Sequence, residues 1–139
     1  MSRLQSVQHA AARLVIGTQC CDHTKPVLRL LHWLLVRQCI DFKVATLVHR
    51  SLSRNSASYL ADVCPLVADV RERRVCSTES RTCVVTRTHS TFGDRVFAAA
   101  GPRLWNSLPP HFRDADLPYS RFRRSLKTFL FGEWGHCAM

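Results

Sequence analysis

Residues 26–50 read PVLRLLHWLLVRQCIDFKVATLVHR and form the most apolar and most regularly patterned part of the chain. In the second half of this stretch, apolar side chains recur at the spacing that lines one face of an α-helix. These side chains are Val36, Ile40, Val44, Leu47 and Val48. The first half is rich in leucine around Trp33, yet it is too short and too often interrupted by charges to cross a bilayer. We therefore expect residues 26–50 to anchor the core.

Two further helices are predicted on the N-terminal side of this stretch. Ser2 and Gln5 resemble a capping box at the start of the first helix, and Gly17 ends its pattern. The apolar stripe between them consists of Leu4, Val7, Ala11, Leu14 and Val15. Thr24 before Pro26 predicts an N-cap and a first turn, so a short second helix should begin there.

A charged segment low in aromatic residues, 69–90, interrupts the helical pattern. We interpret it as an exposed basic linker. Within it, residues 82–87 are rich in β-branched side chains, which favour a strand. Residues 95–97 follow a Gly-Asp pair, so the two segments could form a possible short β-hairpin across a long loop.

The length of the chain suits one domain, which we divide into two helical halves. Residues 1–68 are predicted to form an N-terminal half with three helices. Residues 91–139 are predicted to form a C-terminal half, with a short helix around Trp105 that follows Gly101-Pro102 and a last amphipathic helix over residues 117–131. The predicted fold class is therefore mainly α, a small helical domain of about five helices.

Basic residues outnumber acidic ones, with 20 Lys and Arg against 10 Asp and Glu, for a net charge of +10. This balance favours an acidic partner such as nucleic acid or an anionic membrane surface, although solvation also explains part of it. Contacts to phosphates need only charge and reach. The candidate nucleic-acid-binding residues are Arg121, Arg123, Arg124, Lys127, Arg71, Arg73, Arg74, Arg81 and Arg87. For each cluster the alternative is an ordinary solvated face.

The cysteine pattern indicates reduced thiols. The seven cysteines are odd in number and lack the rhythm of a disulfide framework, and no Asn-x-Ser/Thr sequon occurs. The N-terminal residues lack the continuous apolar core of a secretory signal. We therefore expect an intracellular protein of the cytoplasm or nucleus.

No cofactor or metal site is predicted. Cysteines and a histidine gather at 20–23, and Cys76, Cys83 and His89 form a looser set, but neither has the paired spacing of a zinc knuckle or ribbon. The five glycines are not clustered, so no phosphate-cradling loop is indicated.

Five segments of the chain carry a resemblance to a known family. They read LQSVQHAAARLVIGT (4–18), HTKPVLRLLHWLLVRQCIDFKVATLVHRSL (23–52), SYLAD (58–62), TFGDRVFAAAGPRLWNSLP (91–109) and FRRSLKTFLF (122–131). In this order they resemble the extreme C-terminal region of reverse transcriptases encoded by LINE-type, non-LTR retrotransposons. The resemblance implies a region that follows the polymerase thumb, so an upstream polymerase domain would be a partner if the chain is part of a longer one.

The enzyme activity of that family is not expected in this chain. Polymerase chemistry needs two carboxylates that hold two metal ions, and reverse transcriptases supply them largely from a Tyr-x-Asp-Asp turn. Tyr59-Leu60-Ala61-Asp62 has one Asp followed by Val63, so we interpret it as packing and turn residues. The endonuclease of such elements lies at the opposite end of the reading frame.

The sequence therefore predicts a non-catalytic, retrotransposon-derived domain that contacts RNA or DNA through basic surfaces. Neither a membrane nor a small-molecule substrate is expected as a partner. The alternative is a structural or protein-interaction module, or a non-functional translated remnant of a truncated element.

Overall fold

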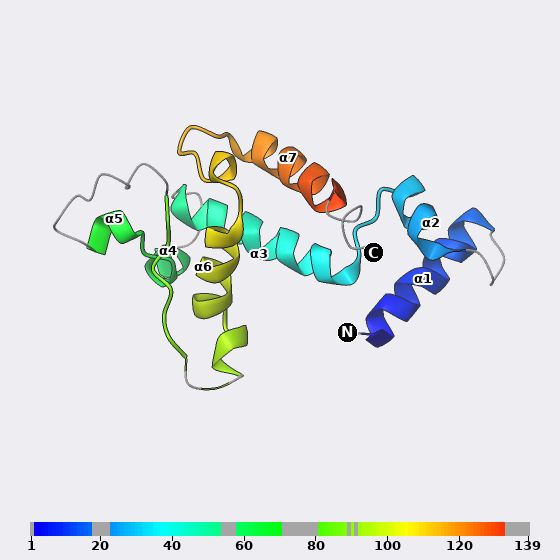
Figure 1. Cartoon of the computed structure of the whole chain (residues 1–139), viewed down its shortest axis with the longest axis horizontal. Helices are drawn as coiled ribbons and strands as arrows, with labels where there is room; N and C mark the ends of the chain where they lie inside the picture. The colour runs from blue at the N-terminus through cyan, green and yellow to red at the C-terminus, as the bar shows by residue number, and fades with distance from the viewer. Residues whose placement is uncertain are drawn as a thin grey trace. The chain divides into compact units, whose positions relative to one another are not determined.

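The computed structural model describes residues 2–17, 23–53, 58–70, 81–88, 90 and 92–132, and these residues are mainly helical, as predicted (Figure 1). The helices are α1 (Ser2–Ile16), α2 (Thr24–Leu30), α3 (Val36–Leu52), α4 (Ser58–Val63), α5 (Val67–Val70), α6 (Phe97–Ser107) and α7 (Tyr119–Gly132), with short 3-10 turns η1 (Gly93–Arg95) and η2 (Pro110–Phe112). The chain divides into two compact units. Unit 1 comprises Met1–Phe42 and Lys127–Met139, and unit 2 comprises Lys43–Leu126. The division falls within α3 and within α7.

The core of unit 1 is small and lies between α1 and α2. Ala12, Val27 and Leu28 are buried, and partly buried side chains pack around them: Ile16, Leu31, Trp33, Leu35 and Phe131. The end of α7 is joined to α3 by Gln38, whose Nε2 donates to the carbonyl of Leu130 at 2.9 Å. Because Trp33 is one of the side chains that pack against this core, it is a packing residue, as the leucine-rich context of its segment predicts.

The helix α1 forms where it was predicted, but its apolar stripe does not face the core of unit 1. Leu4, Val7, Leu14 and Val15 are all exposed, Leu14 to 85%. The glutamines beside this stripe face inward: Gln8 Nε2 donates to the Leu34 carbonyl at 2.7 Å, and Gln5 Oε1 accepts from the Val36 amide at 3.0 Å. These bonds satisfy backbone groups at the start of α3, and they fix which face of α1 is turned inward.

A left-handed residue ends α2. His32 has φ +53°. The N–H of Trp33 donates to the Leu28 carbonyl at 2.9 Å, and the N–H of His32 donates to the Arg29 carbonyl at 3.0 Å. This is the arrangement in which helices commonly terminate, although glycine usually occupies the left-handed position. The ring of His32 meets the ring of Phe131 edge-on, with centroids 6.4 Å apart.

The core of unit 2 is larger and is built on aromatic residues. Trp105, Phe112 and Phe122 are almost fully buried and lie with Val48 of α3 and Leu126 of α7. These side chains are brought together by α3, α6 and the first half of α7, because each helix has one apolar face and must bury it against another. Unit 2 thus contains the aromatic core, and it also contains most of the predicted binding residues that the structure describes.

The helix around Trp105 is longer than predicted, because α6 begins at Phe97 and continues through Gly101 and Pro102. Three consecutive alanines favour helix before the proline, and Pro102, the sixth residue of α6, removes one backbone hydrogen bond of the helix. Gly101 is needed for close packing: a Cβ there would lie 3.1 Å from Cγ2 of Val48. The small residue therefore lets α6 approach α3 closely.

The candidate β-hairpin between residues 82–87 and 95–97 is wrong. Arg95 ends η1 and Phe97 begins α6, so the second segment is helical in character. Cys83 instead forms an isolated antiparallel bridge with Leu66. Two backbone hydrogen bonds of 2.9 Å make this bridge: the N–H of Val67 donates to the Thr82 carbonyl, and the N–H of Val84 donates to the Pro65 carbonyl. Figure 1 shows the extended segment running beside α6. The other edge of this segment is bonded by α6 side chains, which leaves no place for a second strand there.

Candidate nucleic-acid interface

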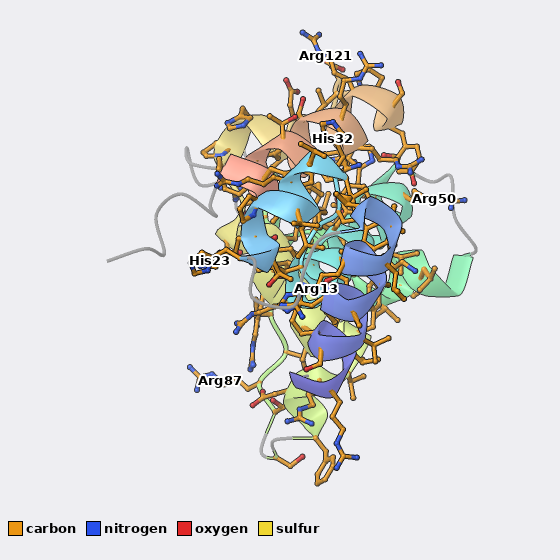
Figure 2. The ribbon with its side chains drawn as sticks, turned by 90° about the vertical axis from the view of Figure 1, so that its right-hand side faces the viewer. Arg13, His23, His32, Arg50, Arg87 and Arg121 are labelled. Atoms are coloured by element: carbon orange, nitrogen blue, oxygen red, sulfur yellow. The ribbon has the colours of Figure 1, made fainter. Side chains whose placement is uncertain are left out.

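Four of the predicted binding residues lie on the exposed side of α7. Arg121, Arg123, Arg124 and Lys127 are exposed, and we call these four residues the basic face. The apolar residues Phe122, Leu126 and Leu130 of the same helix are buried. Helical spacing explains the separation, because residues three and four apart share a face. Figure 2 shows the side chain of Arg121 extending away from the ribbon.

The other predicted basic residues are placed differently. Arg71, Arg73 and Arg74 lie outside the described residues. Arg87 is exposed on the extended segment and points away from the ribbon (Figure 2). Arg81 is half-buried, and its Nη2 donates to the Leu52 carbonyl at 2.7 Å. The guanidinium of Arg81 therefore donates to a backbone carbonyl at the C-terminal end of α3, and Arg81 is not part of the candidate interface.

A pocket of about 660 Å³ in unit 2 adjoins the basic face. It lies between the end of α3, the loop over residues 115–118 and the start of α7, and its charged lining residues are Arg50, Asp116 and Arg123. Cζ of Arg50 lies 5.9 Å from the ring centroid of Tyr119, and Cζ of Arg123 lies 5.6 Å from it. Two guanidinium groups therefore gather around one aromatic ring, an arrangement that cation–π attraction stabilises.

His49 forms the buried wall of this pocket. Its side chain is 3% exposed, and its ring stacks on Phe122 with centroids 4.2 Å apart and an interplanar angle of 23°. Nε2 lies 3.2 Å from the Leu117 carbonyl, which can only accept, so Nε2 carries the hydrogen. This bond ties the loop over residues 115–118 to α3. Because loop and helix both line the pocket, His49 fixes the position of one wall relative to the other.

Burial lowers the pKa of His49 below its ordinary value, and the nearby charge of Arg81 lowers it further, against the opposing effect of the Leu117 hydrogen bond. The ring is therefore neutral at pH 7. With Nε2 as the donor, Nδ1 of a neutral ring is an acceptor. Nδ1 is buried and has no hydrogen-bond partner among the described residues. A buried acceptor in this state is unusual and can receive a hydrogen bond.

Two of the described cysteines, Cys64 and Cys83, are not set up as nucleophiles. Burial raises the pKa of the Cys64 thiol, and burial together with Cys64 raises the pKa of Cys83 to about 12. Both thiols are thus protonated at neutral pH, the unreactive form. The described part of the chain contains no group of three His, Cys, Asp or Glu residues able to hold a metal ion. The looser predicted set is only partly described, since Cys76 and His89 lie outside the described residues.

Of the residues that line the pocket, Arg123 was predicted from the sequence as a candidate binding residue, and His49, Arg50 and Tyr119 were not. Tyr119 and Arg123 are four residues apart in a predicted helix, a spacing that could have indicated a ring and a guanidinium in contact. His49 and Arg50 gave no such signal, because their role depends on a loop almost seventy residues further along, as the His49–Leu117 bond shows.

In the residues that the structure describes, no helix is both long enough and apolar enough to cross a membrane.

Comparison of the chain with protein-family models, with curated proteins and with solved structures finds no match.

Proposed function

We propose that the chain is a non-catalytic domain that binds RNA or DNA through the basic face of α7. One observation carries the proposal: within 14 residues α7 presents four cations to solvent, contains no acidic residue and buries its apolar side chains. Like charges this close repel one another, so the face gains from an anionic partner that releases condensed counterions when it binds. Arg87 is a further exposed cation of the same unit.

The resemblance to the C-terminal region of LINE-type reverse transcriptases supports the same proposal. A domain of that origin would act beside a polymerase that handles RNA and DNA, and it would need no catalytic residues of its own. Phosphate contacts made by arginine and lysine position a nucleic acid without reading its sequence. We therefore propose a role in holding template RNA or target DNA, with little sequence preference.

The test is a fluorescence-anisotropy titration of the 139-residue chain against labelled single-stranded RNA, single-stranded DNA and duplex DNA at several salt concentrations. Replacing Arg121 and Arg124 with Gln should weaken binding and reduce the slope of log K against log salt by about 1.4 for single strands and about 1.8 for duplex DNA, the values for two lost phosphate contacts. The matched control replaces the exposed Arg3 and Lys25 with Gln, which removes the same charge elsewhere. No binding at low salt, or equal effects of the two double variants, would contradict the proposal.

A protein-interaction module is the second candidate, and the exposed face of α1 favours it. Leu4, Val7, Leu14 and Val15 are each more than 60% exposed on a single helix. An exposed apolar surface of this kind marks a contact site for another protein. Replacing Leu4 and Leu14 with Gln should then abolish any self-association seen by analytical ultracentrifugation. A chain that is already monomeric at high concentration would count against this candidate.

A further inference from the structure

The pocket beside the basic face has the composition of an anion site with an aromatic wall. Its charged lining comprises two guanidinium groups, from Arg50 and Arg123, and one carboxylate, from Asp116. His49 is neutral because its pKa is lowered, so the lining keeps a net positive charge at pH 7. Arginine presents several donors in a planar fork that matches phosphate oxygens. Paired arginines in a concavity therefore favour an oxyanion such as a phosphate over a halide.

The arginines are oriented rather than scattered. Each has its guanidinium carbon within 6 Å of the Tyr119 ring centroid, and each comes from a different helix. The ring thus holds the ends of two long side chains near one place and lowers the entropy they lose when a ligand binds. Both arginines also line the pocket, so a phosphate that enters it meets two cationic side chains. A smooth basic surface offers no such convergence.

The shape of the site indicates what the phosphate belongs to. A pocket of about 660 Å³ falls in the range of roughly 300–1,000 Å³ in which small ligands are enclosed. The phosphates of a duplex lie along a convex ridge, whereas an unpaired nucleotide can turn its phosphate and base into a concavity. The lining also supplies an acceptor, the Asp116 carboxylate, for the hydroxyl and amino groups that a nucleotide carries.

We infer that this pocket accepts one unpaired nucleotide of a bound RNA or DNA strand, with the phosphate of that nucleotide held between Arg50 and Arg123. The inference rests on the proposed nucleic-acid-binding function and deepens it. The basic face supplies attraction along the strand, and the pocket supplies a preference for single-stranded over duplex nucleic acid. Tyr119 and His49 are positioning residues: the first gathers the guanidinium groups, and the second ties the loop over residues 115–118 to α3.

The experiment compares two double variants that lose the same charge. R50Q/R123Q changes the pocket, and R121Q/R124Q changes only the basic face of the same unit. The probes are a labelled 12-nucleotide single-stranded RNA, the DNA strand of the same sequence, and the corresponding duplex DNA. All four replaced arginines are exposed, and circular dichroism and melting temperature verify that each variant folds.

R50Q/R123Q should weaken binding to the single strands about tenfold more than R121Q/R124Q does, the effect of losing one well-oriented charge-assisted contact. On the duplex, R50Q/R123Q should lose no more affinity than R121Q/R124Q does, because only Arg123 of its two residues belongs to the basic face. Y119L should lower single-strand affinity, whereas Y119F, which keeps the ring, should retain it. A tighter complex with RNA than with DNA would identify a 2′-hydroxyl as one of the donors, and equal affinity would assign the contacts to phosphate and base.

The two proposals are separated by the outcome. If the unmodified chain binds single strands and the two double variants lose affinity equally, the pocket inference is overturned while the basic face remains the binding surface. If the unmodified chain binds no nucleic acid at low salt, the proposed function itself is overturned, and the inference that rests on it is overturned with it.

Discussion

The side-chain amide of Asn106 pairs with both backbone groups of Cys83, accepting from its N–H at 2.9 Å and donating to its C=O at 2.8 Å. A side chain on α6 thus takes the place of a neighbouring strand. Trp105 reinforces it, since its indole Nε1 donates to the Arg81 carbonyl at 2.7 Å. With the Leu66 bridge on the other edge, the segment around Cys83 is bonded on both sides.

Asn106→Ala should therefore destabilise the fold. Cys83 is buried, and the substitution leaves its N–H and C=O without these partners, which should lower the free energy of unfolding by about 2 kcal/mol. Urea denaturation followed by circular dichroism measures the change. The control is Ser107→Ala, an exposed neighbour whose hydroxyl bonds only locally, to the Leu104 carbonyl. Equal midpoints for the two variants would show that the paired amide contributes nothing.

The buried His49 predicts a loss of stability in mild acid. Its folded pKa lies below its ordinary value of 6.5, so the unfolded chain takes up a proton first as the pH falls. The contribution of the neutral ring is complete above pH 6.5 and is lost as the pH falls below it toward the folded pKa. Melting temperatures between pH 7.5 and 5 should therefore fall more for the unmodified chain than for His49→Gln.

Exposed His23 provides the matched control for this acid effect. His23→Gln removes an exposed histidine and so reports the effect of the substitution itself on the melting temperature. A His49→Gln chain that keeps the full pH dependence would place the titrating group elsewhere.

The thiol of Cys83 should resist alkylation in the folded chain. Its pKa is raised from 9.0 to about 12, so almost no thiolate forms at pH 8.5, and burial limits access as well. Iodoacetamide treatment followed by mass spectrometry should show Cys83 modified slowly in buffer and rapidly in urea. By the same linkage, the unfolded chain loses the proton above pH 9 while the folded chain retains it, so stability should fall between about pH 9 and 12. Equal alkylation rates in buffer and urea would contradict the burial of this thiol.

Enlarging Gly101 should separate α3 from α6. Gly101→Val adds methyl groups where a Cβ alone would lie 3.1 Å from Val48, and overpacking of this kind costs about 2 kcal/mol. Chemical denaturation measures the loss. Gly132→Val is the control, because nothing lies within 4 Å of a Cβ at that glycine. Similar losses in both variants would mean that helix propensity, rather than the contact with Val48, determines the effect.

Helical periodicity predicted the parts of this fold that depend on local sequence. The second half of the 26–50 stretch became α3, and the apolar spacing after residue 117 became α7 with Phe122 and Leu126 buried. For α7 the helix and its buried side follow from the same pattern. In α3 the pattern predicts the helix, but Ile40 and Leu47 of its predicted apolar face are exposed, and Val48 is buried together with Ala45 and His49.

Local pattern was a poorer guide where polar contacts from distant residues decide the structure. The apolar stripe of α1 predicted an inward face, but Gln5 and Gln8 bond the start of α3 and turn that stripe outward. The β-branched residues beginning at Thr82 predicted a strand paired with a later one, whereas Asn106 supplies the pairing from a helix. The pocket also depends on the hydrogen bond between His49 and the Leu117 carbonyl. The residue spacing in neither segment predicts this bond.

The left-handed conformation of His32 has a consequence for how this chain tolerates substitution. Any residue with a Cβ is strained at φ +53°, and glycine is not, so His32→Gly should raise stability by up to about 1 kcal/mol despite losing the edge contact with Phe131. In a library randomised at this codon and selected for folded protein, glycine and asparagine should be enriched, and valine and isoleucine depleted. The residues that the selection enriches at position 32 would then report the backbone angle φ at this position.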